Sequence, residues 1–424
     1  MKVLVIGGGG REHALCWALH RSPRVTQVVC APGNAGIAQL GRCIPVDQAS
    51  VADMLRVVEA EQPALVVVGP EVPLSAGIVD ALQARGVRVF GPTQAAARLE
   101  SSKAFSKDLM QRSDIPTARY VVADSIAAVH AALPSFNMPV VVKADGLAAG
   151  KGVVIAASAV DAASSAQELI ALSGSVVLEE FLEGEELSFF ALCDGTHAAA
   201  IAAAQDHKRI GEGDTGPNTG GMGAYSTDAL MDDDLRTWLL HNVAQKTVDA
   251  MRAQGTPFRG ILFCGIMRTS AGPMVLEFNT RWGDPETQAI ILRMETDVLD
   301  LIDASIDGTA RDLQVTMKPG ASVCVIAASA GYPATATTGV VIHGLDADKD
   351  GVMPPGVVVF HSGTQQQADQ IVTSGGRVLG VTATADHLRR ALGKAYEGMG
   401  QISFAGMQVR RDIGWRALAK ERRP

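Results

Sequence analysis

Aromatic residues and cysteines are both scarce in this chain of 424 residues. Phe, Trp and Tyr together make up only 4% of the sequence, whereas small residues abound, which favours tight turns and helices packed closely on a sheet. The six cysteines include no Cys-x-x-Cys pair, so the spacing of a common zinc or dithiol motif is absent. Most of them lie in apolar stretches, and we expect small core residues in a reducing compartment.

Long apolar runs and an excess of positive charge are also missing. No stretch approaches the roughly 20 apolar residues of a membrane span. Met1-Lys2 leads into four apolar residues and a glycine run, unlike a signal peptide. The net charge of −8 gives no general attraction to nucleic acid, so an anionic ligand must be held by local charges and backbone amides. We therefore expect a soluble, cytoplasmic protein without a nucleic-acid or membrane partner.

The first hundred residues alternate short apolar strands with helical patterns. Strands are predicted at 2–6, 27–30, 64–68 and 87–90. This alternation predicts a parallel sheet covered by helices on both faces, of the Rossmann-like type. The whole chain, with 47% apolar residues, is too long for one ordinary core, and we expect two to four domains.

A glycine run, Gly7–Gly10, connects the first strand to the first helix. The exposed N–H groups of such a turn suit a phosphate group. The pattern of a nicotinamide-dinucleotide site is not met, because Glu12 stands where a third glycine is needed and the second strand ends in Ala31-Pro32 without an acid. We expect a phosphate-bearing substrate at Gly9 and Gly10. A turn that serves only close helix packing is the alternative.

The loops after the predicted strands should line one edge of this sheet, where ligands of parallel sheets bind. These loops are 32–34, 69–71 and 91–93. Glu71, at the end of the second loop, is therefore a further candidate for substrate binding.

Two lysines belong to a glycine-rich element in the middle of the chain. The predicted strand 138–144 carries Lys143 in an apolar run, where a lysine either extends to the surface or meets a buried anion. The loop Gly146–Gly152, with Lys151, then leads into a strand at 153–156. Its backbone N–H groups could contact a triphosphate, although it is not the P-loop, which has Ser or Thr after the lysine. A flexible surface hairpin is the alternative.

An acidic turn follows a strand in the segment Val176–Glu186, which contains five carboxylates. Such a concentration of charge is typical of a solvated loop. Beside a nucleotide, the same segment could supply backbone bonds to an adenine edge and a carboxylate for the ribose hydroxyls.

The segment 205–225 is rich in Gly, Asp, Thr and Asn and has almost no apolar content. We expect a long loop before a helix from about Asp228, and loops of this length are functional or disordered. Asn218–Gly221 could form a backbone nest for an anion, and Asp206 and Asp214 could hold an ammonium group.

A short strand is predicted at 274–279, followed by a turn. Glu277 and Asn279 share one face of it, because side chains two apart on a strand point the same way. A carboxylate and an amide oxygen suit Mg²⁺, which is usually shared with substrate phosphates. Arg281 follows, and its planar guanidinium could bind a carboxylate or a phosphate. An edge strand with a solvated polar face is the alternative.

These elements occur in an order that resembles the ATP-grasp ligases and, more narrowly, the phosphoribosylamine–glycine ligase family. The resemblance runs from Met1 to Ala417. It is carried by the following segments: GGGGREHAL (7–15), GPEVPL (69–74), KADGLAAGKGVVIA (143–156), QDHKRIGEGDTGPNTGGMGAY (205–225), EFNTRWGDPETQ (277–288) and GGRVLGVTA (375–383).

The resemblance implies an α/β protein with an ATP-grasp fold, an N-terminal Rossmann-like parallel-sheet domain and a small C-terminal mixed α+β domain. The expected boundaries are 1–102, 103–312 with a lid at about 117–190, and 313–424. The implied reaction uses ATP to join glycine to 5-phosphoribosylamine through a glycyl phosphate, an early step of purine biosynthesis. As to assembly, we expect a monomer or a weak homo-oligomer.

The resemblance also implies roles for individual residues. Arg281 and Lys143 would be catalytic, and Glu277 and Asn279 would bind Mg²⁺ or Mn²⁺. ATP would be bound by Lys103, Lys143, Gly146, Gly150, Lys151, Gly152, Glu179, Glu180, Phe181, Leu182 and Glu186. The two substrates would be bound by Gly9, Gly10, Glu71, Asp214, Asn218, Thr219, Gly220, Gly221 and Arg281.

One departure from the wider ATP-grasp pattern concerns the metal. Many members carry a metal-binding acid on the preceding strand, but the segment 260–267 contains no carboxylate here, so the number of metal ions is left open. An NAD(P)-dependent oxidoreductase, an ATP-grasp ligase for another acid and amine, and a non-catalytic nucleotide sensor are the alternatives.

Overall fold

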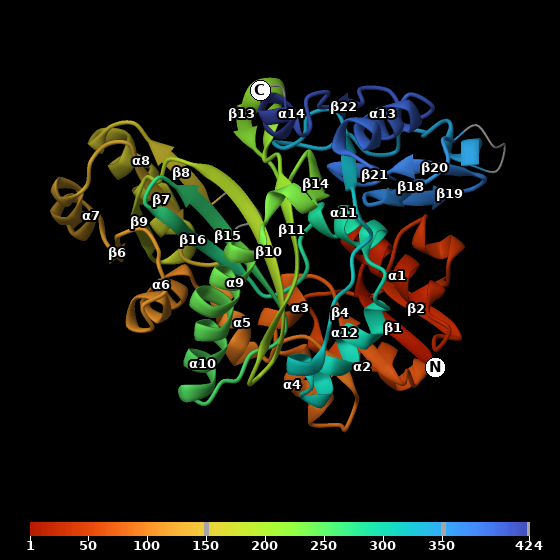
Figure 1. The fold of residues 1–424 in the computed structure, drawn as a ribbon, viewed down its shortest axis with the longest axis horizontal. Coiled ribbons are helices and arrows are strands. Elements are labelled where there is room, and N and C mark those ends of the chain that lie inside the picture. The colour runs from red at the N-terminus through yellow and green to blue at the C-terminus, as the bar shows by residue number, and fades with distance from the viewer. Residues whose placement is uncertain (148–151, 349–352, 422–424) are drawn as a thin grey trace.

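The structure, a computed structural model, describes residues 1–147, 152–348 and 353–421. The N-terminal part is a parallel five-stranded sheet in the order β3-β2-β1-β4-β5, at the lower right in Figure 1. Its strands are β1 (Lys2–Gly7), β2 (Gln27–Pro32), β3 (Arg42–Cys43), β4 (Leu65–Val68) and β5 (Val89–Phe90). The predicted parallel sheet is thus confirmed, and the last predicted strand is shorter than expected.

Helices cover both faces of this sheet because the inner residues of its central strands are apolar on both faces. Val3 and Val5 of β1 pack in the same cluster as Leu15, whereas Leu4 and Ile6 point to the opposite face. The helices of this part are α1 (Gly10–Arg21), α2 (Val51–Glu61), α3 (Glu71–Ser75), α4 (Ile78–Gln83) and α5 (Gln94–Ser101). The carboxyl ends of β1, β2 and β4 meet at one edge, as expected for parallel strands.

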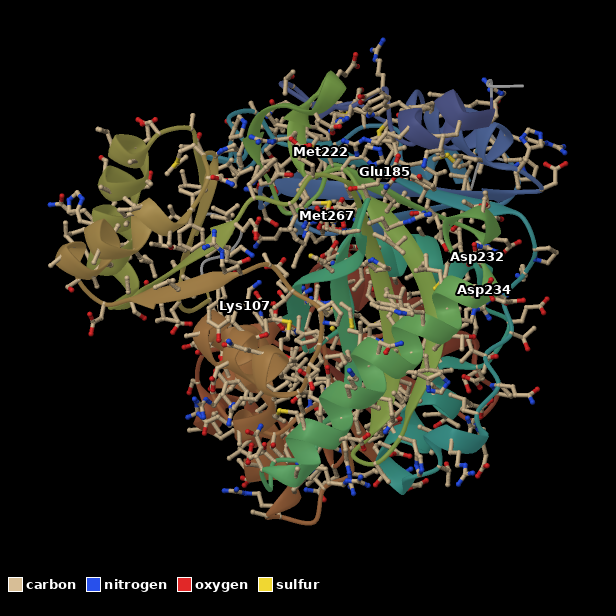
Figure 2. All side chains as sticks on the ribbon, turned by 60° about the vertical axis from the view of Figure 1, so that its left-hand side comes forward. Lys107, Glu185, Met222, Asp232, Asp234 and Met267 are labelled. Carbon is tan, nitrogen blue, oxygen red and sulfur yellow. The ribbon has the colours of Figure 1, made fainter. Side chains whose placement is uncertain are left out.

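A small antiparallel sheet, here called the lid sheet, projects from the body at the left of Figure 1. Its order is β6-β9-β7-β8, and α7 and α8 cover one face. Lys107, on α6 (Lys103–Arg112), lies where the lid sheet meets the body (Figure 2). The elements of the lid are β6 (Tyr120–Ala123), α7 (Ile126–Ala132), β7 (Val140–Ala144), β8 (Val153–Ala156), α8 (Ala159–Ser173) and β9 (Val176–Glu180).

The largest sheet has nine strands and runs from the middle of the chain into its C-terminal part. Its order is β16-β15-β10-β11-β14-β17-β21-β18, with β22 paired to β17. Strand β14 pairs with β17, so the expected C-terminal strands extend the central sheet. The strands are β10 (Glu185–Asp194), β11 (Ala198–Asp206), β14 (Gly223–Thr227), β15 (Arg259–Thr269), β16 (Gly272–Asn279), β17 (Ala321–Ala328), β18 (Val357–His361), β21 (Arg377–Ala385) and β22 (Gln408–Val409).

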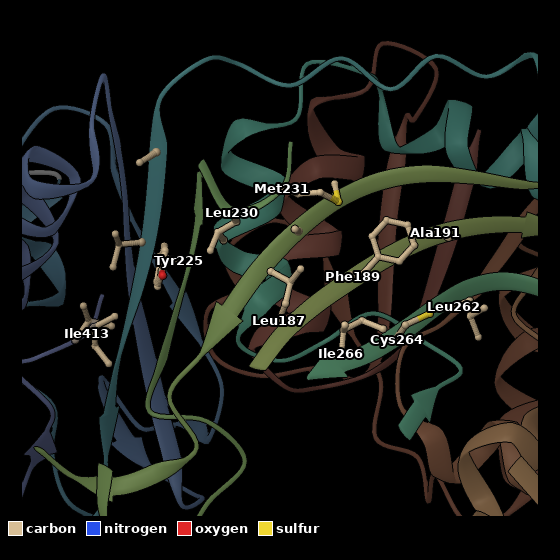
Figure 3. Packing of buried hydrophobic residues seen from close by; sticks show 14 of the residues in the cluster. Leu187, Phe189, Ala191, Tyr225, Leu230, Met231, Leu262, Cys264, Ile266 and Ile413 are labelled. Atoms are coloured by element: carbon tan, nitrogen blue, oxygen red, sulfur yellow. The ribbon is translucent and has the colours of Figure 1, made fainter. Parts of the chain in front are cut away.

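Alternating residues of β10 divide the core between the two faces of this sheet. Leu187 and Phe189 face one side (Figure 3), and their cluster also includes residues of the helices α9 and α10. Phe190 and Leu192 face the other side, with α12 and the N-terminal sheet. The helices that pack on the sheet are α9 (Asp233–Leu239), α10 (Lys246–Ala253), α11 (Glu286–Arg293), α12 (Val298–Asp307), α13 (Leu388–Met399) and α14 (Trp415–Glu421).

The expected long loop at 205–225 is wrong, because most of it is paired β-structure. It contains the end of β11, a hairpin of β12 (Arg209–Gly211) and β13 (Thr215–Asn218), and the start of β14. The hairpin is stabilised by backbone pairing and by distant residues such as Arg410, and not by an apolar face. Its sequence therefore lacks the alternation of apolar and polar residues that would have predicted a strand. The following helix begins at Asp233, later than expected, after a cap at Asp232.

No helix of the described ranges is both long and apolar enough to cross a membrane.

Candidate active site

A buried carboxylate, that of Glu179 on β9, lies between two lysines. Its Oε2 atom is 2.8 Å from Lys107 Nζ and 2.9 Å from Lys143 Nζ. Lys143, on the neighbouring strand β7, also donates to the carbonyl oxygen of Leu276 at 3.3 Å. Glu179 Oε1 is buried and has no hydrogen-bond partner within the described part of the chain. The sequence predicted that Glu179 contacts a nucleotide. In the structure, its carboxylate is instead paired with the two lysines.

Lys107 is a residue that the sequence analysis missed. Burial lowers the pKa of its ammonium group to about 8, although the charge of Glu179 raises it. A signal was present, since Lys107 follows Lys103 by four residues and such neighbours share one face of a helix. Its partner Glu179, however, lies on a strand more than seventy residues later in the chain, so the local sequence could not predict this ion pair.

Lys103 and the glycine-rich loop come together at the first turn of α6. Lys103 Nζ donates to the carbonyl oxygen of Gly146 at 3.0 Å. Gly146 has a φ of +145°, a conformation that side-chain-bearing residues rarely adopt. The carbonyl of Gly152 accepts from Ala144 N–H at 2.8 Å. Gly150 and Lys151, also predicted for ATP binding, lie outside the described residues.

The segment after β9 leads from the lid sheet to the central sheet. Glu180 is exposed, and its N–H donates to the carbonyl oxygen of Arg119 at 2.9 Å. Phe181 and Leu182 are half-buried. The carboxylate of Glu186 is ion-paired with Lys208, a second lysine that the sequence analysis missed.

The two predicted metal ligands lie on β16, beside this group of cations. Burial alone would raise the pKa of Glu277, but the charges of Lys208, Lys143, Lys103 and Arg281 lower it below its usual range. Glu277 is therefore an ionised carboxylate that faces the lysines. Asn279 Oδ1 lies near it and accepts from Arg281 Nη2 at 3.2 Å.

This pair of oxygens fits an ion that takes few ligands from the protein. Within the described residues, no group of three or more His, Cys, Asp or Glu side chains could hold a metal ion by itself. One carboxylate and one amide oxygen suit a hard divalent cation that completes its shell with water and phosphate oxygens.

Arg281 is held by two carboxylates from the N-terminal part. Its Nη2 atom is 2.8 Å from Glu100, and its Nε atom is 3.4 Å from Glu71. Burial raises the pKa of Glu100, although the charge of Arg281 opposes this. Burial would also raise the pKa of Glu71, but the charges of Arg281 and Arg11 keep it below its usual value. Glu71 was predicted for this site, and Glu100 was missed because nothing in its helix marks it.

The glycine turn after β1 lies close to residues from the C-terminal half. Gly9 N–H donates to Glu12 Oε2 at 2.7 Å, so the protein itself uses this donor. A side chain at Gly10 would collide with Gln288 and Ser362. Gln288 Oε1 and Ser362 Oγ are buried without a partner in the part of the chain that the structure describes. Unpaired polar atoms around a glycine with no room for a Cβ mark a polar niche beside Gly10.

Arg377 closes this niche from β21. Its guanidinium is 3.2 Å from Asp284 Oδ2 and donates to the carbonyls of Asp284 and Gly220 at 2.6 and 2.5 Å. The backbone of Arg11 approaches the same carboxylate, with its N–H at 3.5 Å. Arg377 and Arg11 lower the pKa of Asp284 against the effect of burial, so the carboxylate stays ionised.

The predicted nest at Asn218–Gly221 is engaged within the protein. Thr219 N–H donates to the carbonyl oxygen of Lys208 at 2.7 Å, Gly220 N–H to Tyr332 Oη at 2.9 Å, and Gly221 N–H to Thr219 Oγ1 at 2.9 Å. These donors are therefore not open to an anion in this structure.

The two aspartates predicted to hold an ammonium group lie in different surroundings. Asp214, in the hairpin, is ion-paired with Arg410 and Arg416, so it is not open to a substrate amine here. Asp206 lies beside Gly221 near Lys208, and burial raises its pKa well above the usual range.

Family models cover most of the chain in three consecutive parts. The N domain of phosphoribosylglycinamide synthetase matches residues 1–100, its ATP-grasp (A) domain matches 101–287, and its C domain matches 322–416. A phosphoribosylamine–glycine ligase of Xanthomonas campestris is 48% identical over 100% of this chain and 99% of its own length. The chain belongs to the phosphoribosylglycinamide synthetase family.

Further relatives agree with this membership. A phosphoribosylamine–glycine ligase of Brucella melitensis is 45% identical over 100% of this chain and 99% of its own length. The crystal structure of the Thermotoga maritima phosphoribosylamine–glycine ligase has a TM-score of 0.80 at 31% identity, covering 97% of this chain and 100% of that one. The biotin carboxylase domain of the Hydrogenobacter thermophilus 2-oxoglutarate carboxylase shares the fold alone, with a TM-score of 0.72 at 14% identity over 96% of this chain and 91% of that one.

Membership of this family confirms the predicted fold class, the enzyme class and the family resemblance. The chain is an ATP-grasp ligase, and enzymes of this kind use ATP with a divalent metal ion. Its cluster of Lys103, Lys143 and Glu277 lies within the matched ATP-grasp domain, whereas the niche beside Gly10 draws residues from all three parts.

Proposed function

We propose that this chain joins glycine to 5-phosphoribosylamine with the use of ATP, giving glycinamide ribonucleotide, ADP and phosphate. The observation that carries the proposal is the position of Glu277 and Asn279, since the charges of Lys103 and Lys143 act on Glu277 and Arg281 donates to Asn279. Similarity to phosphoribosylamine–glycine ligases over the whole chain supports the choice of substrates.

The proposed chemistry has two steps. Glycine's carboxylate is a poor electrophile, so one of its oxygens first attacks the γ-phosphorus of ATP, and ADP leaves with the electrons of the broken P–O bond. The amine of phosphoribosylamine then attacks the acyl carbon of glycyl phosphate, and phosphate leaves. Phosphoryl transfer of this kind depends mainly on positioning and charge neutralisation.

In this proposal the lysines neutralise the phosphates of ATP. The charges of Lys103 and Lys143 both act on Glu277 and lower its pKa. The glycine-rich loop after Gly146 stays a prediction for phosphate binding, since its residues 148–151 lie outside the described residues. The adenosine would lie along residues 179–182, with Glu186 for the ribose.

The metal ion that we propose is Mg²⁺, or Mn²⁺ in its place, at Glu277 and Asn279. When bound there, it would neutralise charge on the phosphate oxygens of ATP. The chain contributes one ionised carboxylate and one amide oxygen on a rigid strand. A hard cation of this kind needs no larger protein cage, since phosphates and water complete its shell.

Arg281 is the proposed site for the carboxylate of glycine. Its guanidinium is held on one edge by Glu71 and Glu100, at 3.4 and 2.8 Å, which orients its planar fork. Ionised Glu71 could also receive the ammonium group of glycine. The same guanidinium would steady the phosphate that departs in the second step.

The niche beside Gly10 is the proposed site of phosphoribosylamine. Gly9 and Gly10 begin helix α1, and its first N–H groups favour a phosphate. Arg377 adds a positive charge, and the unpaired atoms of Gln288 and Ser362 would gain partners. Asn218–Gly221 and Asp214 stay predictions for this substrate, because their polar groups are engaged within the protein here.

The expected division at 102 and 312, with a lid at about 117–190, is also a proposal. The lid sheet and its helices lie within that lid range. We further propose a cytoplasmic enzyme that acts as a monomer or a weak homo-oligomer.

Phosphate release with ATP, glycine and 5-phosphoribosylamine, each omitted in turn, tests the proposed function. Release should need all three compounds, and the product should contain one glycine per phosphate released. Turnover that is indifferent to glycine would show that the chain joins another acid and amine. A sample that binds ATP but releases no phosphate under any condition would instead favour a nucleotide sensor.

An NAD(P)-dependent oxidoreductase, an alternative that the sequence left open, does not agree with the ATP-grasp ligase family to which the chain belongs. It predicts nicotinamide-cofactor binding by the N-terminal sheet. Calorimetric titration of the full chain with NADH and with ATP separates the two, because only ATP should bind.

A further inference from the structure

We infer that Lys107 is a positioning residue for ATP, which acts through Glu179 to leave the ammonium group of Lys143 free to bind phosphate. This inference rests on the proposed function, in that Lys143 is taken to contact the phosphates of ATP. Lys107 itself would touch no substrate atom.

The geometry places Lys107 behind the carboxylate of Glu179. The side chain of Lys107 is 2% exposed and that of Glu179 is 3% exposed, whereas that of Lys143 is 8% exposed. The two ammonium groups meet the same carboxylate oxygen, at 2.8 and 2.9 Å. Lys107 is thus the more deeply buried of the two lysines, whereas Lys143 donates directly to the backbone of β16, at Leu276 beside Glu277.

A second set of bonds fixes Lys107 in this place. Its Nζ atom donates to Thr117 Oγ1 at 2.7 Å, and Thr117 Oγ1 donates to the carbonyl of Val275 at 2.6 Å. Val275 N–H in turn donates to the carbonyl of Pro116 at 2.8 Å. Lys107 thus joins α6 to the segment before the lid sheet and, through it, to β16.

The charges of the three residues explain why this arrangement matters. Two ammonium groups share one carboxylate, so one positive charge is left over, and Lys143 is the ammonium closer to the proposed phosphates. Without Lys107, Glu179 and Lys143 would form a neutral one-to-one pair. A lysine paired in this way binds phosphate less well, because a new partner must displace the old one. Lys107 thus prevents the capture of Lys143 by Glu179.

Two variants test the inference by changing the charge of the trio in steps. Lys107→Met removes the positive charge and keeps most of the length of the side chain. The double variant Lys107→Met/Glu179→Gln removes the carboxylate as well, which restores the surplus positive charge on Lys143. A purely structural role for Lys107 predicts that the double variant is at least as defective as the single one.

Calorimetric titration with ATP, ADP and AMP in the presence of Mg²⁺ provides the readout. We expect Lys107→Met to weaken ATP binding about tenfold, the effect of one charge-assisted hydrogen bond. The double variant should recover most of the affinity, and AMP, which lacks the β- and γ-phosphates, should bind all forms equally. Equal weakening for AMP, or a double variant that binds ATP no better than the single one, would overturn the inference.

Controls separate this result from a folding defect. Lys420→Met removes an exposed lysine that is 2.6 Å from Glu185, so it matches the loss of a Lys–Glu pair elsewhere and should leave ATP binding unchanged. Circular dichroism and the thermal midpoint check each variant. If Lys107→Met does not fold, Lys107→Gln, which can still bond to Thr117, replaces it in the same comparison.

The outcome also distinguishes the inference from the proposed function. Recovery of ATP affinity in the double variant, without glycine-dependent phosphate release by the wild type, would sustain the role of Lys107 and refute the ligase substrates. Conversely, the wild type could release phosphate only with glycine while the double variant fails to recover ATP affinity. That result would support the ligase substrates and refute the role of Lys107.

Discussion

Glu100 holds the guanidinium of Arg281 from the N-terminal part of the molecule, with 2.8 Å between the carboxylate and Nη2. The other oxygen of Glu100 accepts from Thr280 N–H at 2.8 Å and from Thr280 Oγ1 at 3.1 Å. Glu100 thus ties the end of α5 to the turn that follows β16. The orientation of Arg281 is set by a residue far from it in sequence.

Replacement of Glu100 by Gln should weaken glycine binding with little effect on ATP. The amide keeps the shape of the carboxylate but loses the ionic bond to Arg281, so the KM for glycine should rise about tenfold. Steady-state kinetics with each substrate varied provides the measurement. Glu59→Gln, which affects an exposed pair 3.9 Å from Arg85, is the control. An equal rise in the KM for ATP would mean a general disturbance of the site.

Replacement of Glu277 by Ala should abolish turnover and leave the fold intact. The change removes the proposed metal ligand but no core volume, since Glu277 is not part of the hydrophobic clusters. We expect a loss of at least about 100-fold in the rate of phosphate release, as for the removal of one electrostatic group from an active site. A variant with a normal circular dichroism spectrum and retained activity would refute the metal role.

Arg377→Met should impair the use of 5-phosphoribosylamine more than the use of the other substrates. The change removes a positive charge beside Gly10 together with three contacts, two of them to Asp284 and one to Gly220. We expect the KM for 5-phosphoribosylamine to rise about tenfold, while ATP affinity by calorimetry is unchanged. Weaker ATP binding would show instead that Arg377 acts on the whole site through the C-terminal part.

The stability of the protein should fall as the pH drops below about 6.5, because buried histidines must gain a proton. Burial, with a contribution from His361, lowers the pKa of His13 to about 3, and burial lowers that of His361 to about 4. These folded-state pKa values lie below the unfolded value, so the stabilisation is complete above about pH 6.5 and is lost as the pH falls toward them.

His13→Asn isolates the contribution of one of these histidines. His13 Nδ1 accepts from His361 N–H at 2.7 Å, and an Asn oxygen can take the same place. Urea unfolding at about pH 7.5 and about pH 5.5 should show that the variant loses about 1.4 kcal/mol less than the wild type between them. An identical loss of unfolding free energy in both proteins would mean that folding does not lower the pKa of His13.

Much of the fold was predictable because its signals are local. The strands at 2–7 and 272–279 are short apolar or alternating runs, and the pairing of Glu277 with Asn279 on one face follows from the two-residue period of a strand. The turn at Gly7–Gly10 was equally predictable, because a glycine run between an apolar strand and a helical pattern is typical of a tight turn.

The hairpin within 205–225 was not predictable from pattern. Its strands β12 and β13 carry no apolar alternation, and they are stabilised by Arg410 and by backbone pairing. The same holds for the continuous nine-stranded sheet, because the pairing of β14 with β17 joins segments about a hundred residues apart.

The sequence by itself determined the parallel sheet, the placement of Glu277 and Asn279 on one face of a strand, and the membership of a ligase family. Each of these depends on residues that are neighbours in the chain. Only the tertiary structure decided which carboxylates meet which cations. Lys107 meets Glu179, and Glu100 meets Arg281, through folding of distant segments. The physical reason is that the electrostatics of a buried site act through space, and no local period of the sequence encodes them.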